Sequence, residues 1–280
     1  MPRLFVGNFD FEHRLAWGAG TLPRSVERVN AELAPVWTAV AEEGDAVWTP
    51  APIDPTIFDR LADRGLPRLR PVFDPGTLCG DGTPVFWGED EWAREAAGRW
   101  GLRWNGCDPT TVRRVNSRRF KCALERRFGV DLPGSAMAQS AVELASAVER
   151  LAGGNGWVLK GEFGGAGREV RFGTGALASA DLAWAGSRFR RGLVVTVEPR
   201  LDRIAEAGLQ YRIGYGGSVA FDGVTPLLTR PGGGYLGSRF DEDAPLRSVW
   251  SEAIAVGDQV AEAVAAEGYF GPLGIDAMRY

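Results

Sequence analysis

The stretch 157-WVLKGEFGGAGREVRF-172 decides the fold of this chain. Its apolar run ends on Lys160, a glycine-rich segment follows, and apolar and charged residues then alternate again. Lysine is scarce, because only Lys121 and Lys160 among the 32 Lys and Arg residues are lysines. An ammonium is a compact point charge, whereas a guanidinium is a planar fork. A lysine beside a glycine loop in an arginine-rich chain therefore indicates a specific task.

The stretch is predicted to form a β-hairpin, with strands at 157–160 and 168–173. A P-loop places its lysine after the glycines and before a helix, and a GxGxxG fingerprint joins a strand to a helix. Neither pattern fits. What remains is a hairpin tip whose backbone N–H groups can approach an anion, with an ammonium at its base. The alternative is an ordinary glycine-rich turn with an exposed lysine.

The first part of the chain predicts a small α/β layer with parallel strands. Its tryptophans, Trp17, Trp37, Trp48, Trp87 and Trp92, are expected in the core. Strands are expected at 3–9, 46–50 and 68–73, helices at 24–44, 56–65 and 88–101, and a loop at 74–84.

From about residue 108 the predicted elements are different. Helix 109–129 carries many arginines, which are expected to form its solvated face, and helix 140–154 begins with Ser140 as a cap. The last strand carries a lone acidic residue, Asp276, which is costly to bury unpaired. The further elements expected are helices at 179–192 and 248–268, strands at 193–201, 209–217, 218–223, 224–230 and 269–280, and a glycine-rich loop at 231–239.

Composition excludes several function classes. The chain has 280 residues, 45% hydrophobic and 24% charged, with net charge −4 and pI near 5.3, so neither nucleic acid nor a membrane is expected as a partner. The N-terminus does not resemble a signal peptide. Three dispersed cysteines without a CxxC pair are typical of a reducing cytoplasm. The single histidine, His13, is expected to be exposed and leaves little basis for a histidine metal site or a Ser-His-Asp triad.

Four motifs in order resemble the ATP-grasp superfamily over roughly residues 113–280. VNSRRF is similar to the segment that opens the lid, WVLKGEFGGAGREV to the phosphate loop, VTVEPRL to the adenine hinge, and GYFGPLGIDAMRY to the strand with the first metal carboxylate. The resemblance implies an α/β (α+β) fold. Its expected parts are a small α/β domain at 1–112 and an ATP-grasp domain at 113–280, divided into a lid at 113–197 and a larger antiparallel-sheet subdomain at 198–280.

The resemblance also implies site residues for ATP and Mg²⁺. Lys160 would bridge the α-phosphate and adenine, Glu198 would accept from the adenine amino group, and Asp276 would bind Mg²⁺. The remaining implied nucleotide contacts are Arg118, Glu162, the loop residues Gly164, Gly165, Ala166 and Gly167, the backbone of Arg200 and Leu201 at the ring edge, and Glu206, or alternatively Asp202, at the ribose.

Several of these residues have simpler explanations. Glu198 could merely end a strand before Pro199. Arg212 and Arg230 could clamp the transferred phosphate or a substrate carboxylate as catalytic groups, or could be ordinary exposed arginines. Arg118, with Arg119 and Lys121 beside it, stands where the family usually has a lysine.

The activity that the resemblance implies is that of a ligase. ATP would activate a small-molecule carboxylate as an acyl-phosphate, and an amine or thiol would displace the phosphate. A kinase acting on a hydroxyl and a nucleotide-binding module without catalysis remain as alternatives, and a homodimer is left open. Because the chain ends at Tyr280 before the family's second metal-binding strand, intact relatives are expected to continue, and this chain is expected to bind ATP weakly.

Overall fold

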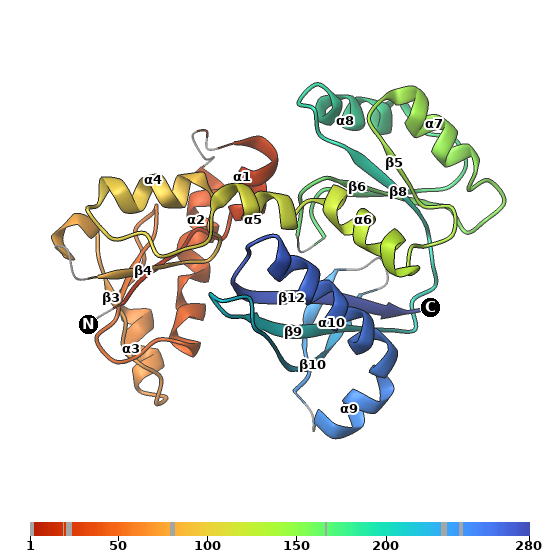
Figure 1. The fold of residues 1–280 in the computed structure, drawn as a ribbon. Coiled ribbons are helices and arrows are strands. Elements are labelled where there is room, and N and C mark those ends of the chain that lie inside the picture. Colours follow the sequence, from red (N-terminus) through yellow and green to blue (C-terminus); the bar gives the residue numbers. More distant parts are fainter. Residues whose placement is uncertain are drawn as a thin grey trace. The chain divides into compact units, whose positions relative to one another are not determined.

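The computed structural model describes residues 3–18, 20, 24–78, 82–165, 167–230, 234–240 and 243–280 (Figure 1). The chain divides into two compact units, residues 1–113 and 114–280. Across the described ranges, no helix is long and apolar enough to cross a membrane.

The N-terminal unit is built on a parallel four-stranded sheet in the order β3-β2-β1-β4. Alternate residues of β1 enter opposite cores: Leu4 and Val6 pack on one face and Phe5 on the other. The strands are β1 (Arg3–Val6), β2 (Ala46–Trp48), β3 (Arg70–Pro71) and β4 (Thr83–Phe86), and the helices are α1 (Phe11–Trp17), α2 (Arg24–Leu33), η1 (Ala34–Ala39), α3 (Thr56–Ala62), η2 (Pro75–Leu78), α4 (Glu91–Arg99) and α5 (Pro109–Val115), which runs across the boundary between the units.

The α/β layer is confirmed, but strand β4 and helix α1 are not predicted. Strand β4 contains Pro84, which has no N–H for a ladder and is tolerated here because β4 is an edge strand. Helix α1 is seven residues long, too short for a clear apolar period, and carries the exposed His13. The helix expected at 24–44 gives way to the 3-10 turn η1 at Pro35, whose ring cannot continue the α-helical hydrogen bonds.

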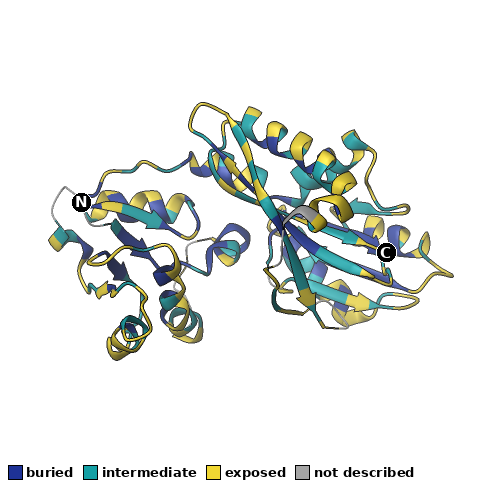
Figure 2. Ribbon diagram, turned by 90° about the horizontal axis from the view of Figure 1, so that it is seen from below, coloured by how far each residue is buried: buried dark blue, intermediate teal, exposed yellow. Residues whose placement is uncertain are grey.

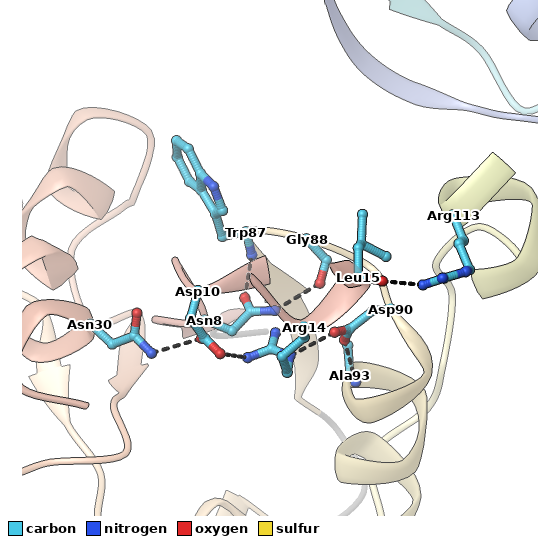
Figure 3. A network of polar contacts seen from close by, with 10 residues as sticks. All are labelled: Asn8, Asp10, Arg14, Leu15, Asn30, Trp87, Gly88, Asp90, Ala93 and Arg113. Carbon is cyan, nitrogen blue, oxygen red and sulfur yellow. Dashed lines mark hydrogen bonds and ion pairs between the residues drawn. The ribbon is translucent and has the colours of Figure 1, made fainter. Parts of the chain in front are cut away.

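Buried polar side chains join the loops that follow β1 and β4 (Figure 3). Asn8 donates to the Gly88 carbonyl at 2.7 Å. Arg14 bridges Asp10 at 2.5 Å and Asp90 at 2.6 Å, and all three side chains are at most 8% exposed. This network therefore links the loops at the carboxyl ends of the adjacent strands β1 and β4.

The tryptophans are not all core residues. Trp37 is buried, and Trp48 and Trp92 are half-buried in the core under β2 and β4. Trp87, in contrast, is 49% exposed, so its expected place in the core is wrong. It follows the end of β4, where its ring contacts Phe9 with 4.9 Å between centroids instead of entering the sheet's core.

The first sheet of the C-terminal unit is antiparallel and has the order β5-β8-β6-β7. One face packs against two helices through Leu159, Val195 and Val197. Ser140 caps the first of these helices by accepting from the Glu143 N–H, as predicted. The elements are β5 (Ala136–Ala138), which is not predicted, β6 (Trp157–Gly161), β7 (Val170–Gly173), β8 (Val195–Pro199), and the covering helices α7 (Ala141–Glu149) and α8 (Ser179–Phe189).

The single helix expected at 109–129 is wrong, because α5 ends at Val115 and α6 (Arg118–Phe128) starts anew. Ser117 is the reason: its side chain accepts from the Phe120 N–H, which caps a new helix. The expectation of a solvated arginine face is also wrong in part. Arg118 and Arg119 at the start of α6 bind the end of β6.

The second sheet of this unit is antiparallel, with the order β11-β10-β9-β12, of which Figure 1 labels β10, β9 and β12. Leu209 and Tyr211 of the inner strand β9 pack with Trp250 and Ala261. In Figure 2, helices of the chain show yellow, exposed residues on one side. The segments 218–223 and 224–230 form one strand, while the predicted helix 248–268 divides near Trp250. The elements are β9 (Ala205–Ile213), β10 (Val219–Thr229), β11 (Tyr235–Ser238), predicted as loop, β12 (Gly271–Arg279), α9 (Asp243–Val249) and α10 (Ser251–Ala266).

Candidate functional site

Lys160 lies on the face of the first sheet that α7 and α8 do not cover. Side chains alternate along a strand, so Leu159 enters the core while Lys160 points the other way. The register pairs Val158 with Glu198, and the Lys160 ammonium reaches the Glu198 carboxylate at 2.5 Å. Glu198 is only 9% exposed and Lys160 25%, so this ion pair is largely withdrawn from water.

Lys121 reaches the same carboxylate from α6. Its Nζ lies 3.4 Å from the second oxygen of Glu198 and 3.0 Å from Glu125, one turn further along the helix. Both lysines of the chain therefore converge on Glu198. The scarcity of lysine had drawn attention to both residues, but of the two lysines only Lys160 was predicted to contact the ligand.

The cluster carries more positive than negative charge. Burial and the neighbouring cations Arg118 and Lys121 lower the pKa of Lys160, even though Glu198 attracts its proton. Burial opposes ionisation of Glu198, but Lys160 and Lys121 outweigh it and lower the pKa of that carboxyl. For Lys121, Glu198 and Glu125 outweigh burial and raise the pKa. Three cations beside the two carboxylates of Glu198 and Glu125 leave an excess of positive charge, which favours the arrival of an anion.

Arginines fix the stem of the hairpin. Arg118 donates from Nε to the Gly161 carbonyl at 2.8 Å, and its backbone N–H donates to the Glu162 carbonyl at 3.1 Å. The Glu162 carboxylate accepts from Arg119 at 3.0 Å and from the Val194 N–H at 2.9 Å. Glu162 thus binds protein groups through both oxygens, which ties the loop's start to α6 and β8.

The glycine loop folds back on itself. Arg168 donates its N–H to the Gly165 carbonyl at 3.0 Å, and Gly167 has φ +75°, which glycine adopts readily. A Cβ on Gly164 would come within 2.8 Å of the Glu169 side chain, so this glycine is required by packing. Ala166 lies outside the described residues.

Asp276 lies on the face of the second sheet opposite α10. The register pairs Asp276 with Gly208 and Met278 with Glu206, which puts both acidic side chains on this face. Desolvation first, and then Glu206, raise the pKa of Asp276, while Lys121 and Lys160 act in the opposite direction. Asp276 is exposed to solvent. It is thus electrostatically coupled to the lysine cluster.

These acids partly fit a divalent cation. Mg²⁺ is usually held by one or two carboxylates together with substrate phosphates and water. Glu206 already accepts from Arg203 at 2.5 Å and from the Thr229 hydroxyl. Within the described ranges, no three His, Cys, Asp or Glu side chains are grouped so as to hold a metal ion by themselves. A metal at Asp276 would therefore need ligands from a bound phosphate.

The hinge after β8 leads directly into the second sheet. The Arg200 N–H donates to the Gly156 carbonyl at 2.9 Å, so this backbone donor already has a protein partner. Asp202 receives a hydrogen bond from Asn155 at 3.3 Å, and Leu201 is half-buried. The first sheet, which ends here with β8, is therefore joined to β9 of the second sheet by residues 200–204.

The two arginines predicted to be catalytic belong to the second sheet, one on β9 and one directly after β10. Arg212 makes a bidentate pair with Asp222, at 2.7 and 2.9 Å, and is 72% exposed. It is four residues along β9 from Gly208, the partner of Asp276, or roughly 13 Å at the strand rise. Arg230 is exposed beyond the end of β10.

A pocket lies beside Glu198, between α6, β5 and β8. It is lined by polar groups of Glu125, Thr196 and Glu198 and by the side chains of Leu132 and Met137. The pocket lies next to the lysine cluster and has a volume of about 40 Å³, so a flat ring would enter it only if the lining residues moved apart.

The fold is similar to that of several solved enzymes. N5-carboxyaminoimidazole ribonucleotide synthetase from Thermus thermophilus matches with TM-score 0.55 and 16% identity over 100% of this chain and 68% of that chain. The biotin carboxylase domain of Hydrogenobacter thermophilus 2-oxoglutarate carboxylase, in complex with MgADP, ADP and bicarbonate, matches with TM-score 0.52 and 14% identity over 99% of this chain and 60% of that chain. D-Alanine–D-alanine ligase from Bacillus anthracis matches with TM-score 0.50 and 12% identity, covering 85% and 83%.

These similarities concern the fold alone. No family model matches the sequence, and no curated protein matches it. The chain spans about two thirds of the length of the synthetase chains, with 65% covered in an ADP complex of the same enzyme type.

Proposed function

Because the chain has the ATP-grasp fold of these enzymes, we propose that it binds ATP at Glu198 and activates a carboxylate with it. The observation that carries the proposal is the convergence of both lysines on one buried carboxylate, one of them at the end of the strand that leads into the glycine loop. Such a cluster attracts an anion, and the backbone of a glycine-rich loop can approach phosphate oxygens closely.

In the proposed complex, Glu198 accepts from the amino group of adenine, whose ring enters the pocket next to it after the lining residues move apart. Lys160 and Lys121 then exchange part of their contact with Glu198 for phosphate oxygens. The hairpin tip donates backbone N–H groups to the outer phosphates and excludes water. Asp276 faces the phosphates from the second sheet, and Mg²⁺ held there with the phosphates would neutralise their charge.

The proposed reaction has two steps. A carboxylate oxygen attacks the γ-phosphorus, the bond to the β-phosphate oxygen breaks, and ADP leaves with that electron pair. An amine or thiol then attacks the acyl carbon, and inorganic phosphate leaves as the nucleophile loses its proton. Neither step needs a nucleophilic side chain, so a chain with a single, exposed histidine can support them.

Nucleotide binding is tested by isothermal titration with ATP in the presence of Mg²⁺. A charge-assisted hydrogen bond contributes about 1.5–3 kcal/mol, so Lys160→Ala should weaken binding roughly 10- to 150-fold. Arg127→Ala is the matched control, because it removes an exposed cation from the same helix as Lys121. Equal affinity of Lys160→Ala and the unaltered chain would refute the proposed pocket.

The chemistry is tested separately by incubating the protein with ATP, a panel of carboxylates and hydroxylamine. Hydroxylamine intercepts an acyl-phosphate, so a ligase yields a hydroxamate together with ADP. A stable phosphorylated product without hydroxamate would instead identify a kinase. Binding of ATP without ADP release for any carboxylate or hydroxyl substrate would leave a nucleotide-binding module.

A further inference from the structure

Glu169, the last residue before the returning strand β7, has an unusual backbone. Its φ is +59°, and within the described residues it is the one non-glycine residue with positive φ. An L side chain is strained in this region, because its Cβ approaches the following carbonyl, and glycine is the usual occupant. A glutamate at this position indicates that the contacts of its carboxylate offset the energy of the strained backbone.

The Glu169 carboxylate binds Arg188 of α8. One oxygen accepts from Nε at 2.7 Å and also from Nη2. The same guanidinium donates from Nη1 to the Trp184 carbonyl at 2.7 Å and lies 3.9 Å from the centroid of the Trp184 ring. Arg188 is 7% exposed, so it is a fixed anchor and not a mobile surface charge.

Two glycines of the hairpin leave room for this ion pair. A Cβ on Gly161 would lie 2.9 Å from the Glu169 carboxylate, and one on Gly164 would lie 2.8 Å from the Glu169 Cβ. The Gly161 N–H also donates to the Glu169 carbonyl at 2.9 Å. These two positions are therefore glycine because a Cβ would collide with Glu169, whether or not a ligand also approaches them.

We propose that the Glu169–Arg188 ion pair is a latch that holds the glycine loop in the conformation that binds the outer phosphates of ATP. Glu169 and Arg188 are positioning residues, since they act through the loop and do not touch the nucleotide. The inference rests on the proposed function. Because the base and α-phosphate bind elsewhere, at Glu198 and the lysines, the latch should affect ATP and leave AMP binding nearly unchanged.

The test compares the dissociation constants for ATP and AMP, by titration, in four variants. Glu169→Gln removes the charge, Glu169→Gly removes it and also relieves the strained φ, and Arg188→Lys replaces the fork by a point charge. Each should weaken ATP about tenfold or more and AMP less than about twofold. Arg171→Lys is the matched control, because Arg171 pairs with Asp181 of α8 at 2.6 Å on the same hairpin but beyond the loop.

Glu169→Gly separates the latch from a purely structural role. If only the backbone conformation mattered, this variant would keep the ATP-to-AMP affinity ratio of the unaltered chain, since glycine adopts the positive φ without strain. An unchanged ratio in Glu169→Gly and Glu169→Gln would overturn the latch. So would an equal change in Arg171→Lys, which would show that any loosened hairpin has this effect.

Hydrogen exchange distinguishes failure of the latch from failure of the proposed function. If the unaltered chain binds neither ATP nor AMP, the proposed function fails, but the latch still predicts faster exchange of the loop amides between Gly164 and Arg168 in Glu169→Gln than in the unaltered chain. Unchanged exchange in these amides would then overturn the latch as well.

Discussion

Replacing Glu198 with glutamine removes the carboxylate that both lysines contact and leaves two ammonium groups without their shared partner. At an effective dielectric constant of about 20, unit charges about 4 Å apart attract by about 4 kcal/mol. Lys160 is 25% exposed and recovers some hydration in the variant. The expected loss for Glu198→Gln is therefore about 2–3 kcal/mol, below the roughly 3–5 kcal/mol of a fully buried pair.

The origin of this loss is tested with a double-mutant cycle. Removing the ammonium in Lys160→Met should make the further change Glu198→Gln much less costly, with a coupling of about 1–2 kcal/mol. The same cycle with Lys121→Met should give a smaller coupling, because Lys121 lies 3.4 Å away and is 43% exposed.

Urea unfolding of the full chain supplies the free energies. Because the chain has two compact units, hydrogen exchange of peptides from β6 and β8 is needed to assign the loss to the C-terminal unit. Asp222→Asn, which removes the exposed partner of Arg212, is the control and should leave stability unchanged within error. A cost for Glu198→Gln that is the same with and without Lys160 would refute the reasoning, since the loss would then come from something other than the ion pair.

Three further predictions concern the nucleotide, the metal and the N-terminal unit. In the protein without ligand the pKa of Lys160 is lowered from 10.5, and a bound polyanion would raise it again. ATP affinity should therefore be constant while Lys160 is protonated and fall as the pH rises through the lowered pKa. Titrations across this pH range should show no such fall in Lys160→Arg. Asp276→Asn removes a like charge near the phosphates, so ATP should bind the variant more tightly than the unaltered chain in EDTA and show less gain from Mg²⁺; equal Mg²⁺ dependence would contradict the assigned position. In the N-terminal unit, Arg14→Met leaves two buried aspartates without their counter-charge and should lower the free energy of unfolding by about 3–5 kcal/mol. Gly88→Ala puts a Cβ 2.0 Å from the Phe11 ring and should destabilise the same unit. Hydrogen exchange of β1 measures both effects, and wild-type protection in a variant would contradict the prediction for it.

The hairpin and its lysine were predictable because the signals are local. Glycine spacing and strand alternation are properties of neighbouring residues, and the pairing of β6 with β7 follows from the short connection between them. The resemblance implied only that Lys160 and Glu198 both meet the adenine; their direct contact was not predicted, since it joins strands separated by α8. Lys121 was missed as a partner because its role depends on where Ser117 restarts the helix.

The Glu169–Arg188 pair could not be read from the sequence. A positive φ on a non-glycine residue leaves no compositional trace, and α8 reaches the loop only after the chain has folded back. Short edge strands were missed for a related reason. The residues of β5 and β11 are too few to show a period, and pairing with β8 and β10 makes them strands.

Arginine and lysine make different kinds of contact at this site because their charged groups differ in geometry. Arg118, Arg119 and Arg188 bind carbonyls and carboxylates around the loop with a planar fork, which fixes orientation as well as distance. Lys121 and Lys160 instead place compact, rotatable charges on a single carboxylate, from which they can turn to an incoming anion. In a chain that otherwise uses arginine, lysine stands where, in the proposed complex, the positive charge changes partner when ATP binds.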